Sequence, residues 1–391
     1  MKKEWEYKKL GDIANDMYRG SGIKREQVTD TGIPCVRYGE IYTTYNIAFD
    51  KCASHTNEEI ISSPKYFETG DILFAITGES VEEIGKSIAY LGKEKCMCGG
   101  DIVVMKHSQY PKYLSYALSS PKAIKQKGLG KTKLKVVHTN IPSLKEISIP
   151  VPPLSEQKEI VEYLDSSFAK IDKLKENAAK NLEEAKALFQ SALKDALEPK
   201  EGWEEKTLGE LVKFSQGLQV DVSNQLERKT EGTVRFLRII DFTQGNQPPR
   251  YIQKPDDKYF LNKNEIAMVR YGCTFGFVCY GYEGVIANNL FKIIIIDHDQ
   301  LTYHYLQHVL KSDIFQKKLK ESVGGTAMPA ISFGMIKSIK IPFPQSVESQ
   351  EYIANNLDSL SEKLNTLQQN YSRICNECVA LKQAILRQVF E

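Results

Sequence analysis

The chain contains two tryptophans, Trp5 and Trp203, and each opens the same motif. Residues 5–13 read WEYKKLGDI and residues 203–211 read WEEKTLGEL, so one pattern recurs after 198 residues in a chain of 391. Further anchors follow in the same order at offsets of 192 to 201 residues, including ISIPVP at 147–152 and IKIPFP at 339–344. A period this long is unsuited to a solenoid and predicts two copies of one large module.

At 391 residues the chain should hold two to three domains, and its hydrophobic content of 41% is ordinary for globular folds. The first residues lack the apolar core of a signal peptide, and the longest aliphatic run, at 293–296, is too short to span a bilayer. The eight cysteines follow no disulfide framework. We therefore expect a cytoplasmic protein that does not bind membranes. The net charge of +2 implies that any binding of nucleic acid relies on local basic patches or on partners.

Each half of the chain changes character once. Short β-branched and aromatic runs, such as those at 71–76 and 102–105, predict buried strands. A stretch without Pro or Gly follows at 155–197, with apolar residues at steps of three and four, and a similar seam recurs at 357–385. The pattern predicts a mixed α/β fold in which globules at 1–154 and 200–348 are joined by long helices at 155–199 and 349–391. Antiparallel pairing of the helices as a coiled coil would close the chain into a cyclic, pseudo-two-fold layout.

Two W-E-x-K-x-L-G globules, each leading through Ile-Pro-x-Pro and a Gln into a long helix, resemble the specificity subunit of type I restriction–modification systems. The first junction carries the fuller form, IPVPPLSEQ at 149–157, while the second lacks the double proline. The resemblance covers nearly the whole chain. It implies that each globule is a target recognition domain for one half of a split double-stranded DNA site. It also implies that the helices set the gap and dock two methyltransferase subunits, which restriction subunits then join. No catalytic residues and no cofactor are expected in such a subunit.

Lysines gather ahead of each long helix, where they could contact DNA phosphates. Residues 121–145 contain seven lysines and no acid, and residues 311–340 contain six lysines against two acids. Such contacts position a protein on DNA and carry little sequence information, and a solvated basic face is the alternative interpretation. The phosphate candidates are Lys86, Lys131, Lys133, Lys135 and Thr326.

Reading of bases requires forked or flat polar side chains beside the strands. The candidates are Arg37, Tyr38, Arg238, Arg270, Tyr271 and Asn288. Arg37 and Arg238 occupy equivalent places in the two copies. Residues shared by both copies serve a scaffold more often than a sequence that each copy reads differently, so this equivalence leaves both roles open.

Two other classes of function compete with a DNA-reading subunit. A DNA-modifying enzyme has little support, because NQPPRY at 246–251 is a poor match to a methyltransferase loop, and the glycines at 78–85 are wrongly spaced for a phosphate loop. Cys375 and Cys378 have the spacing of zinc ligands but lack a second pair, and the six histidines form no visible cluster, so no metal is expected. The other rival is a coiled-coil adaptor with two protein-binding heads. The lysine-rich stretches favour DNA over that adaptor.

Overall fold

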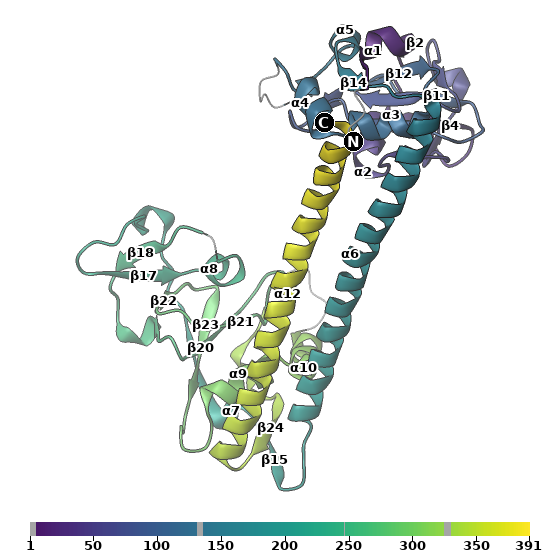
Figure 1. Ribbon diagram of the computed structural model, residues 1–391. Helices are drawn as coiled ribbons and strands as arrows, with labels where there is room; N and C mark the ends of the chain where they lie inside the picture. The colour runs from purple at the N-terminus through teal and green to yellow at the C-terminus, as the bar shows by residue number, and fades with distance from the viewer. Residues whose placement is uncertain (1–4, 131–135, 246, 324–329) are drawn as a thin grey trace. The chain divides into compact units, whose positions relative to one another are not determined.

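The computed structural model describes residues 5–130, 136–245, 247–323 and 330–391 (Figure 1). The chain forms two compact units. Unit 1 comprises residues 1–178 and 372–391, and unit 2 comprises residues 179–371. Each unit contains a mixed α/β globule together with parts of two helices of 44 residues each, α6 (Leu154–Leu197) and α12 (Val347–Phe390). The predicted apolar seams therefore do form long helices.

Unit 1 is built on two five-stranded sheets, ordered β2-β12-β8-β10-β5 and β3-β6-β4-β11-β7. The first sheet consists of β2 (Ala14–Arg19), β5 (Ala48–Phe49), β8 (Ile72–Ala75), β10 (Ser87–Tyr90) and β12 (Ile102–His107). The second consists of β3 (Val28–Thr29), β4 (Ile33–Val36), β6 (Ser54–Thr56), β7 (Tyr66–Phe67) and β11 (Cys96–Cys98). The helices are α1 (Leu10–Ile13), α2 (Tyr38–Thr43), α3 (Pro111–Leu118), α4 (Pro121–Lys127) and α5 (Ile141–Lys145).

Unit 2 contains two four-stranded sheets, ordered β16-β23-β20-β21 and β18-β17-β22-β19. Their strands are β16 (Val212–Gln216), β17 (Thr233–Leu237), β18 (Arg250–Gln253), β19 (Phe260–Leu261), β20 (Ile266–Val269), β21 (Val278–Cys279), β22 (Gly284–Ile286) and β23 (Leu290–Ile295). The short helices are α7 (Leu208–Leu211), α8 (Ile239–Thr243), α9 (Tyr303–Lys311), α10 (Asp313–Val323) and α11 (Phe333–Lys337).

The two units share one strand topology, which confirms the duplication. In unit 1, β12 pairs antiparallel with both β2 and β8, and β4 lies parallel to β11. In unit 2, β23 pairs antiparallel with both β16 and β20, and β17 lies parallel to β22. The strands predicted from the runs at 71–76 and 102–105 are β8 and β12, and every residue of β8 is buried. The fold is therefore the predicted mixed α/β fold with two similar domains.

In each unit, the two repeated motifs pair with each other as the strands of a small sheet. Strand β1 (Tyr7–Lys9) pairs with β14 (Ser148–Pro150), and β15 (Trp203–Thr207) pairs with β24 (Lys340–Pro344). The W-E-x-K segment and the Ile-Pro-x-Pro segment therefore recur together because each needs the other's backbone hydrogen bonds.

The remaining positions of the first motif also have a physical role. Leu10 and Leu208 are fully buried. The glycine that follows each leucine lies against a lysine side chain, so an added Cβ would come within 3.2 Å of Lys145 in the first copy and 3.0 Å of Lys337 in the second. The acid then caps a short helix, since Glu210 accepts a hydrogen bond from the backbone N–H of Thr207 at 2.6 Å.

Within unit 1, the last turns of α12 run antiparallel to the start of α6. The Cys378 thiol lies 3.8 Å from the Ile171 carbonyl oxygen, and the Lys382 ammonium lies 5.1 Å from the centre of the Phe168 ring. Phe390 packs against Tyr113 of α3, and its carbonyl oxygen accepts a hydrogen bond from the Tyr7 hydroxyl at 2.9 Å. Both ends of the chain therefore belong to this unit, as Figure 1 shows.

The corresponding core of unit 2 also includes both long helices. Leu193 and Leu197 at the end of α6 are buried in one cluster with Ile353 and Leu357 near the start of α12. Strands β16, β20 and β23 contribute further apolar side chains to this cluster, as do α9 and α10. The apolar seam of each long helix is therefore covered by core residues of a globule near both of its ends, as well as by the other helix.

Candidate nucleic-acid interface

Unit 1 has a polar groove of about 800 Å³ where the ends of several strands meet. It lies at the end of β2, at the start of α2 and at the turn between β11 and β12. Its charged and aromatic lining residues are Arg19, Arg25, Arg37, Tyr38, Glu40 and Asp101. Three guanidinium groups, one phenol and two carboxylates thus surround a space where the backbone is also accessible.

Glycines create the groove by letting two backbone segments approach closely. A Cβ on Gly20 would lie 2.2 Å from the Gly99 carbonyl oxygen, which no side chain tolerates. The next residue, Ser21, forms a parallel bridge with Gly99. Gly22 also lines the groove, but nothing lies within 4 Å of its Cβ position. Gly20 is therefore needed for close packing, whereas Gly22 leaves open space.

Arg37 and Tyr38 both reach this groove. The Arg37 backbone N–H donates a hydrogen bond to Glu40 at 2.9 Å, which caps α2. Its Nε atom lies 3.7 Å from the Glu40 carboxylate and is buried without a hydrogen-bond partner. Tyr38 is 40% exposed. The Arg37 side chain as a whole is 32% exposed, so this pair offers part of a guanidinium group and an aromatic face to a ligand in the groove.

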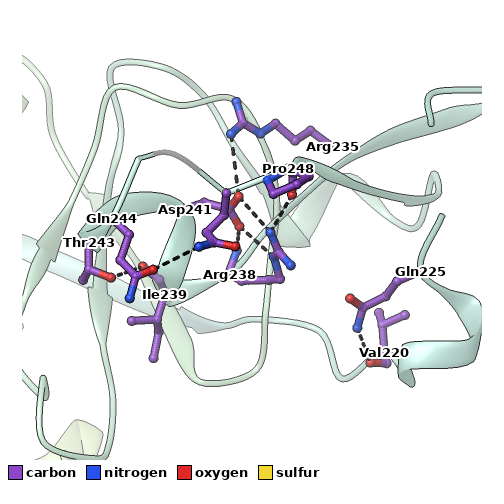
Figure 2. Close-up of polar contacts among 10 residues, drawn as sticks. Val220, Gln225, Arg235, Arg238, Ile239, Asp241, Thr243, Gln244 and Pro248 are labelled. Atoms are coloured by element: carbon purple, nitrogen blue, oxygen red, sulfur yellow. Dashed lines mark hydrogen bonds and ion pairs between the residues drawn. The ribbon is translucent and has the colours of Figure 1, made fainter. Parts of the chain in front are cut away.

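Arg238 is the structural counterpart of Arg37, but its guanidinium group is already engaged (Figure 2). Its Nε and Nη2 atoms donate hydrogen bonds to Asp241 at 2.9 and 3.2 Å, and Nη2 also donates to the Pro248 carbonyl oxygen at 2.9 Å. The Asp241 side chain is fully buried, and Arg235 approaches the same carboxylate at 3.8 Å. These contacts favour the scaffold role for Arg238, because a buried carboxylate needs such partners.

The other candidates in unit 2 surround the turn at 287–289, between β22 and β23. The Arg270 backbone N–H donates to the Asn289 carbonyl oxygen at 2.9 Å, and the Arg270 guanidinium lies 5.6 Å from the Phe333 ring centre. Tyr271 follows Arg270 and is 40% exposed. Asn288 is half-buried, and the Oδ1 atom of Asn289 is buried with no hydrogen-bond partner. The fold thus places Arg270 and Tyr271, which follow β20, beside the turn that contains Asn288.

Lys86 lies outside the groove of unit 1. Its ammonium donates hydrogen bonds to the backbone carbonyl oxygens of Tyr42 and Tyr45 at 3.3 and 3.1 Å. Burial lowers the pKa of Lys86, because the charged ammonium loses solvation. A role in closing the end of α2 therefore accounts for Lys86 better than a phosphate contact does.

Four further candidates, Lys131, Lys133, Lys135 and Thr326, lie outside the described residues. Their described neighbours occupy equivalent places. After the first segment, β13 (Val137–His138) pairs with β9 (Thr77–Gly78), and after the second, Ala330 forms a bridge with Tyr271.

Arg19 and Arg25 were not expected from the sequence, yet both line the groove. Arg19 forms an ion pair with Asp101 at 2.7 Å and keeps 61% of its side chain exposed. The available sequence signal is the Gly-Ser-Gly run at 20–22, which directly follows Arg19 and marks a close backbone approach.

Within the described ranges, one group of side chains has the chemistry of a metal site, and it belongs to unit 2. His304 and His308 of α9 meet Asp358 of α12, with their ligand atoms within 4.8 Å of one another. The expectation that the histidines form no cluster is thereby corrected, since folding joins residues about fifty positions apart. In the same ranges, no helix has the length and apolar character needed to cross a bilayer.

Comparison with known proteins matches this duplicated architecture. The family model of the type I restriction modification DNA specificity domain matches the chain twice, at residues 2–184 and 200–374. The type I restriction enzyme MjaVIII specificity subunit of Methanocaldococcus jannaschii is 24% identical over 390 residues, covering 92% of this chain and 86% of that protein. The StySPI specificity subunit of Salmonella potsdam is 21% identical over 411 residues, covering 96% and 86%.

Solved structures show the same fold. A structure from work on complex assembly and conformational transition of the type I R-M system aligns with a TM-score of 0.81 at 17% identity. That alignment covers 98% of this chain and 97% of the other. The HsdS subunit from Thermoanaerobacter tengcongensis aligns with a TM-score of 0.63 at 19% identity, covering 100% and 97%.

Proposed function

The chain belongs to the type I restriction–modification DNA specificity family, and from that membership we propose that it reads a split double-stranded DNA site, one half with each unit. The observation that carries this proposal is a shared scaffold with different side chains at the same turn. Unit 1 has Gly-Gly-Asp at 99–101, whereas unit 2 has Ala-Asn-Asn at 287–289. Equivalent backbones with different polar groups suit the reading of two different base sequences.

We assign a role to each candidate residue from its contacts within its unit. Tyr38 and Tyr271 are 40% exposed, and Arg37 has an unpaired Nε atom. Arg270 is half-buried and donates a hydrogen bond from Nε to the Ile331 carbonyl oxygen at 3.4 Å. These four residues lie beside the turns and are our candidates for base contacts. Lys131, Lys133, Lys135 and Thr326 are supported as phosphate contacts by sequence alone. Asn288 adds an amide, which pairs well with adenine. Arg238 serves mainly to hold the turn around Asp241.

We divide the chain into recognition domains at 1–154 and 200–348 and spacer helices at 155–199 and 349–391. The low net charge of +2 supports dependence on partners for tight binding. We propose that two methyltransferase subunits dock on the chain and supply the chemistry, that restriction subunits join them, and that the chain itself is non-catalytic and uses no cofactor.

Domain exchange tests the proposal. In a complex with its methyltransferase subunits, replacing residues 200–348 by another such domain should change one half of the methylated motif and leave the other half intact. Sequencing of methylated motifs measures both halves at once. A simultaneous change in both half-sites would contradict the one-unit, one-half-site assignment.

Two arginine substitutions separate reading from scaffolding within unit 2. Arg270→Ala should relax discrimination at one position by about 1–3 kcal/mol if this side chain forks onto a guanine. Arg238→Ala should instead lower the stability of unit 2, because the buried Asp241 carboxylate would lose the hydrogen bonds from the Arg238 guanidinium. Equal loss of affinity for all DNA sequences with Arg270→Ala would assign this residue to phosphate contact instead.

A further inference from the structure

An i, i+4 pair of histidines on α9 faces one carboxylate on α12 within unit 2. The Nε2 atom of His304 lies 2.7 Å from Asp358 Oδ2, and the Nε2 atom of His308 lies 2.9 Å from Asp358 Oδ1. The two imidazole rings have centroids 5.9 Å apart, as expected of neighbouring turns on one helix face. Three side chains that can coordinate a metal therefore hold their ligand atoms within 4.8 Å of one another.

The environment of His304 implies a cation at this point. Its Nδ1 atom lies 2.9 Å from Glu351 Oε2, so both ring nitrogens face carboxylate oxygens. A neutral imidazole has only one N–H, which would leave one nitrogen lone pair facing a carboxylate oxygen. A second proton or a metal ion on Nε2 removes that conflict. Glu351 then acts as the outer carboxylate that orients a metal-binding histidine.

The first copy of the module has different side chains at the equivalent positions. There, Lys112 and Tyr116 of α3 contact Asp165 of α6 at 2.5 and 2.7 Å. An ammonium and a hydroxyl thus connect the short helix to the long one without any imidazole. The short helix can therefore be joined to the long helix without histidines, as in unit 1. The histidine pair in unit 2 can then serve a further function.

We propose that His304, His308 and Asp358 bind one divalent transition-metal ion of the zinc class. Two imidazole nitrogens and one carboxylate oxygen suit Zn²⁺, Co²⁺ or Ni²⁺ better than the oxygen-preferring Mg²⁺ and Ca²⁺. The Asp358 side chain is 52% exposed, which leaves a fourth position for water. Metal–ligand bonds of about 2.0–2.2 Å separate neighbouring ligand atoms by roughly 3.3 Å. The two nitrogen–oxygen pairs, now 2.7 and 2.9 Å apart, would move slightly outward, and the ligand atoms that lie up to 4.8 Å apart would move inward.

The ion takes the place of the proton on each Nε2 atom. Each imidazole then binds as the neutral ring with its one N–H on Nδ1, and only a second proton on a doubly protonated ring passes to solvent. The ion joins α9 to α12 through coordinate bonds, so it should stabilise the junction between the globule and the long helix in unit 2. Glu351 remains outside the coordination sphere and acts as a positioning residue through His304.

The full chain, reduced and stripped with a chelator, can be titrated with Zn²⁺ by calorimetry and with Co²⁺ by visible spectroscopy. We expect one ion per chain and a cobalt spectrum of nitrogen and oxygen ligation. The matched variant His304→Lys with His308→Tyr copies the first module, so it should keep the contacts to Asp358 and lose this ion. Glu351→Gln should weaken binding by about 10-fold, the effect of losing an outer-shell partner.

Thermal unfolding in chelator should be similar for the wild type and the double variant, which controls for folding. If the double variant does not fold, X-ray absorption of the wild-type chain with Zn²⁺ decides the ligand set, for which we expect two imidazoles. The proposal is overturned if the wild type binds no stoichiometric ion, if the folded double variant retains it, or if a sulfur-to-cobalt charge-transfer band assigns the ion to cysteines.

Discussion

Gln157 and Gln350 occupy the same buried position in the two units and make the same hydrogen bonds. Gln157 accepts from the Tyr110 backbone N–H at 2.9 Å and donates to the Pro152 carbonyl oxygen at 2.8 Å. Gln350 accepts from the Thr302 backbone N–H at 3.1 Å and donates to the Pro344 carbonyl oxygen at 2.9 Å. Both side chains are fully buried. Each glutamine thus connects the start of a long helix to the strand and helix before it.

Replacing Gln157 by Leu should destabilise unit 1 by about 3 kcal/mol, because a buried N–H and a buried carbonyl oxygen lose their partners. Denaturant unfolding can be followed by Trp5 fluorescence in a Trp203→Phe background, which restricts the signal to unit 1. The exposed neighbour provides the control, since Lys158→Ala should change the unfolding free energy by less than about 0.5 kcal/mol. If Gln157→Leu were as stable as Lys158→Ala, the hydrogen bonds of the glutamine would not stabilise unit 1.

Gly20→Ala should destabilise unit 1 by about 1–3 kcal/mol, since the added methyl group would collide with the Gly99 carbonyl oxygen. Gly22→Ala is the matched control in the same groove, because its Cβ meets nothing within 4 Å. The same Trp5 measurement reports both variants. If both substitutions had the same small effect, the close approach of the two backbone segments would not be required for folding.

His107 should make unit 1 less stable as the pH falls from about 6.5 to 4. Burial lowers the pKa of His107 to about 4, and its Nε2 atom is buried without a hydrogen-bond partner. The unfolded chain therefore binds this proton first, so stability is retained above the unfolded pKa of about 6.5 and is lost progressively toward pH 4.

In His107→Gln this contribution, on the order of 2–3 kcal/mol, should disappear from the pH dependence of the unfolding free energy. Both chains can be denatured at pH 7 and at pH 4.5 in the Trp203→Phe background. The difference between their pH dependences isolates the contribution of His107, because the other titrating groups contribute equally to both chains. Parallel pH profiles for the two chains would show that His107 is protonated equally in both states.

Inserting four helical residues between Lys175 and Leu182 should lengthen the gap in the methylated DNA motif and leave both half-sites unchanged. This prediction depends on the proposed function and on the unbroken helix α6. Four residues add about 6 Å and slightly more than one turn, so the apolar face stays nearly in phase. Two residues rotate the face by about 200° and should abolish specific methylation. If the gap stayed unchanged after the four-residue insertion, helix α6 would not set the distance between the half-sites.

Much of the fold was predictable because its signals are local or repeated. The motifs at 5–13 and 203–211 recur almost unchanged, and they form β1 and β15 with the short helices that follow. The apolar seams at 155–197 and 357–385 are periodic, so α6 and α12 were apparent from spacing alone. Buried strands such as β8 and β12 consist of continuous apolar runs, which need no knowledge of their neighbours.

The candidate site was less predictable because its members come from separate strands. Arg37 and Arg238 look equivalent in the sequence, and both cap a short helix, but only the tertiary contacts show that Asp241 and Pro248 hold Arg238 in place. Lys86 carries a charge that suggests DNA, whereas the fold directs its ammonium to backbone carbonyl oxygens.

The sequence by itself therefore determined the duplication, the two long helices and the family, because these depend on repeated motifs and on the periodic burial of apolar residues. Only the tertiary structure decided which polar groups meet. It placed Arg19 beside Asp101 in the groove, and it joined His304 and His308 to Asp358 across about fifty residues. The physical reason is that polar contacts depend on distances of about 3 Å, and these distances are set when strands and helices distant in sequence pack together.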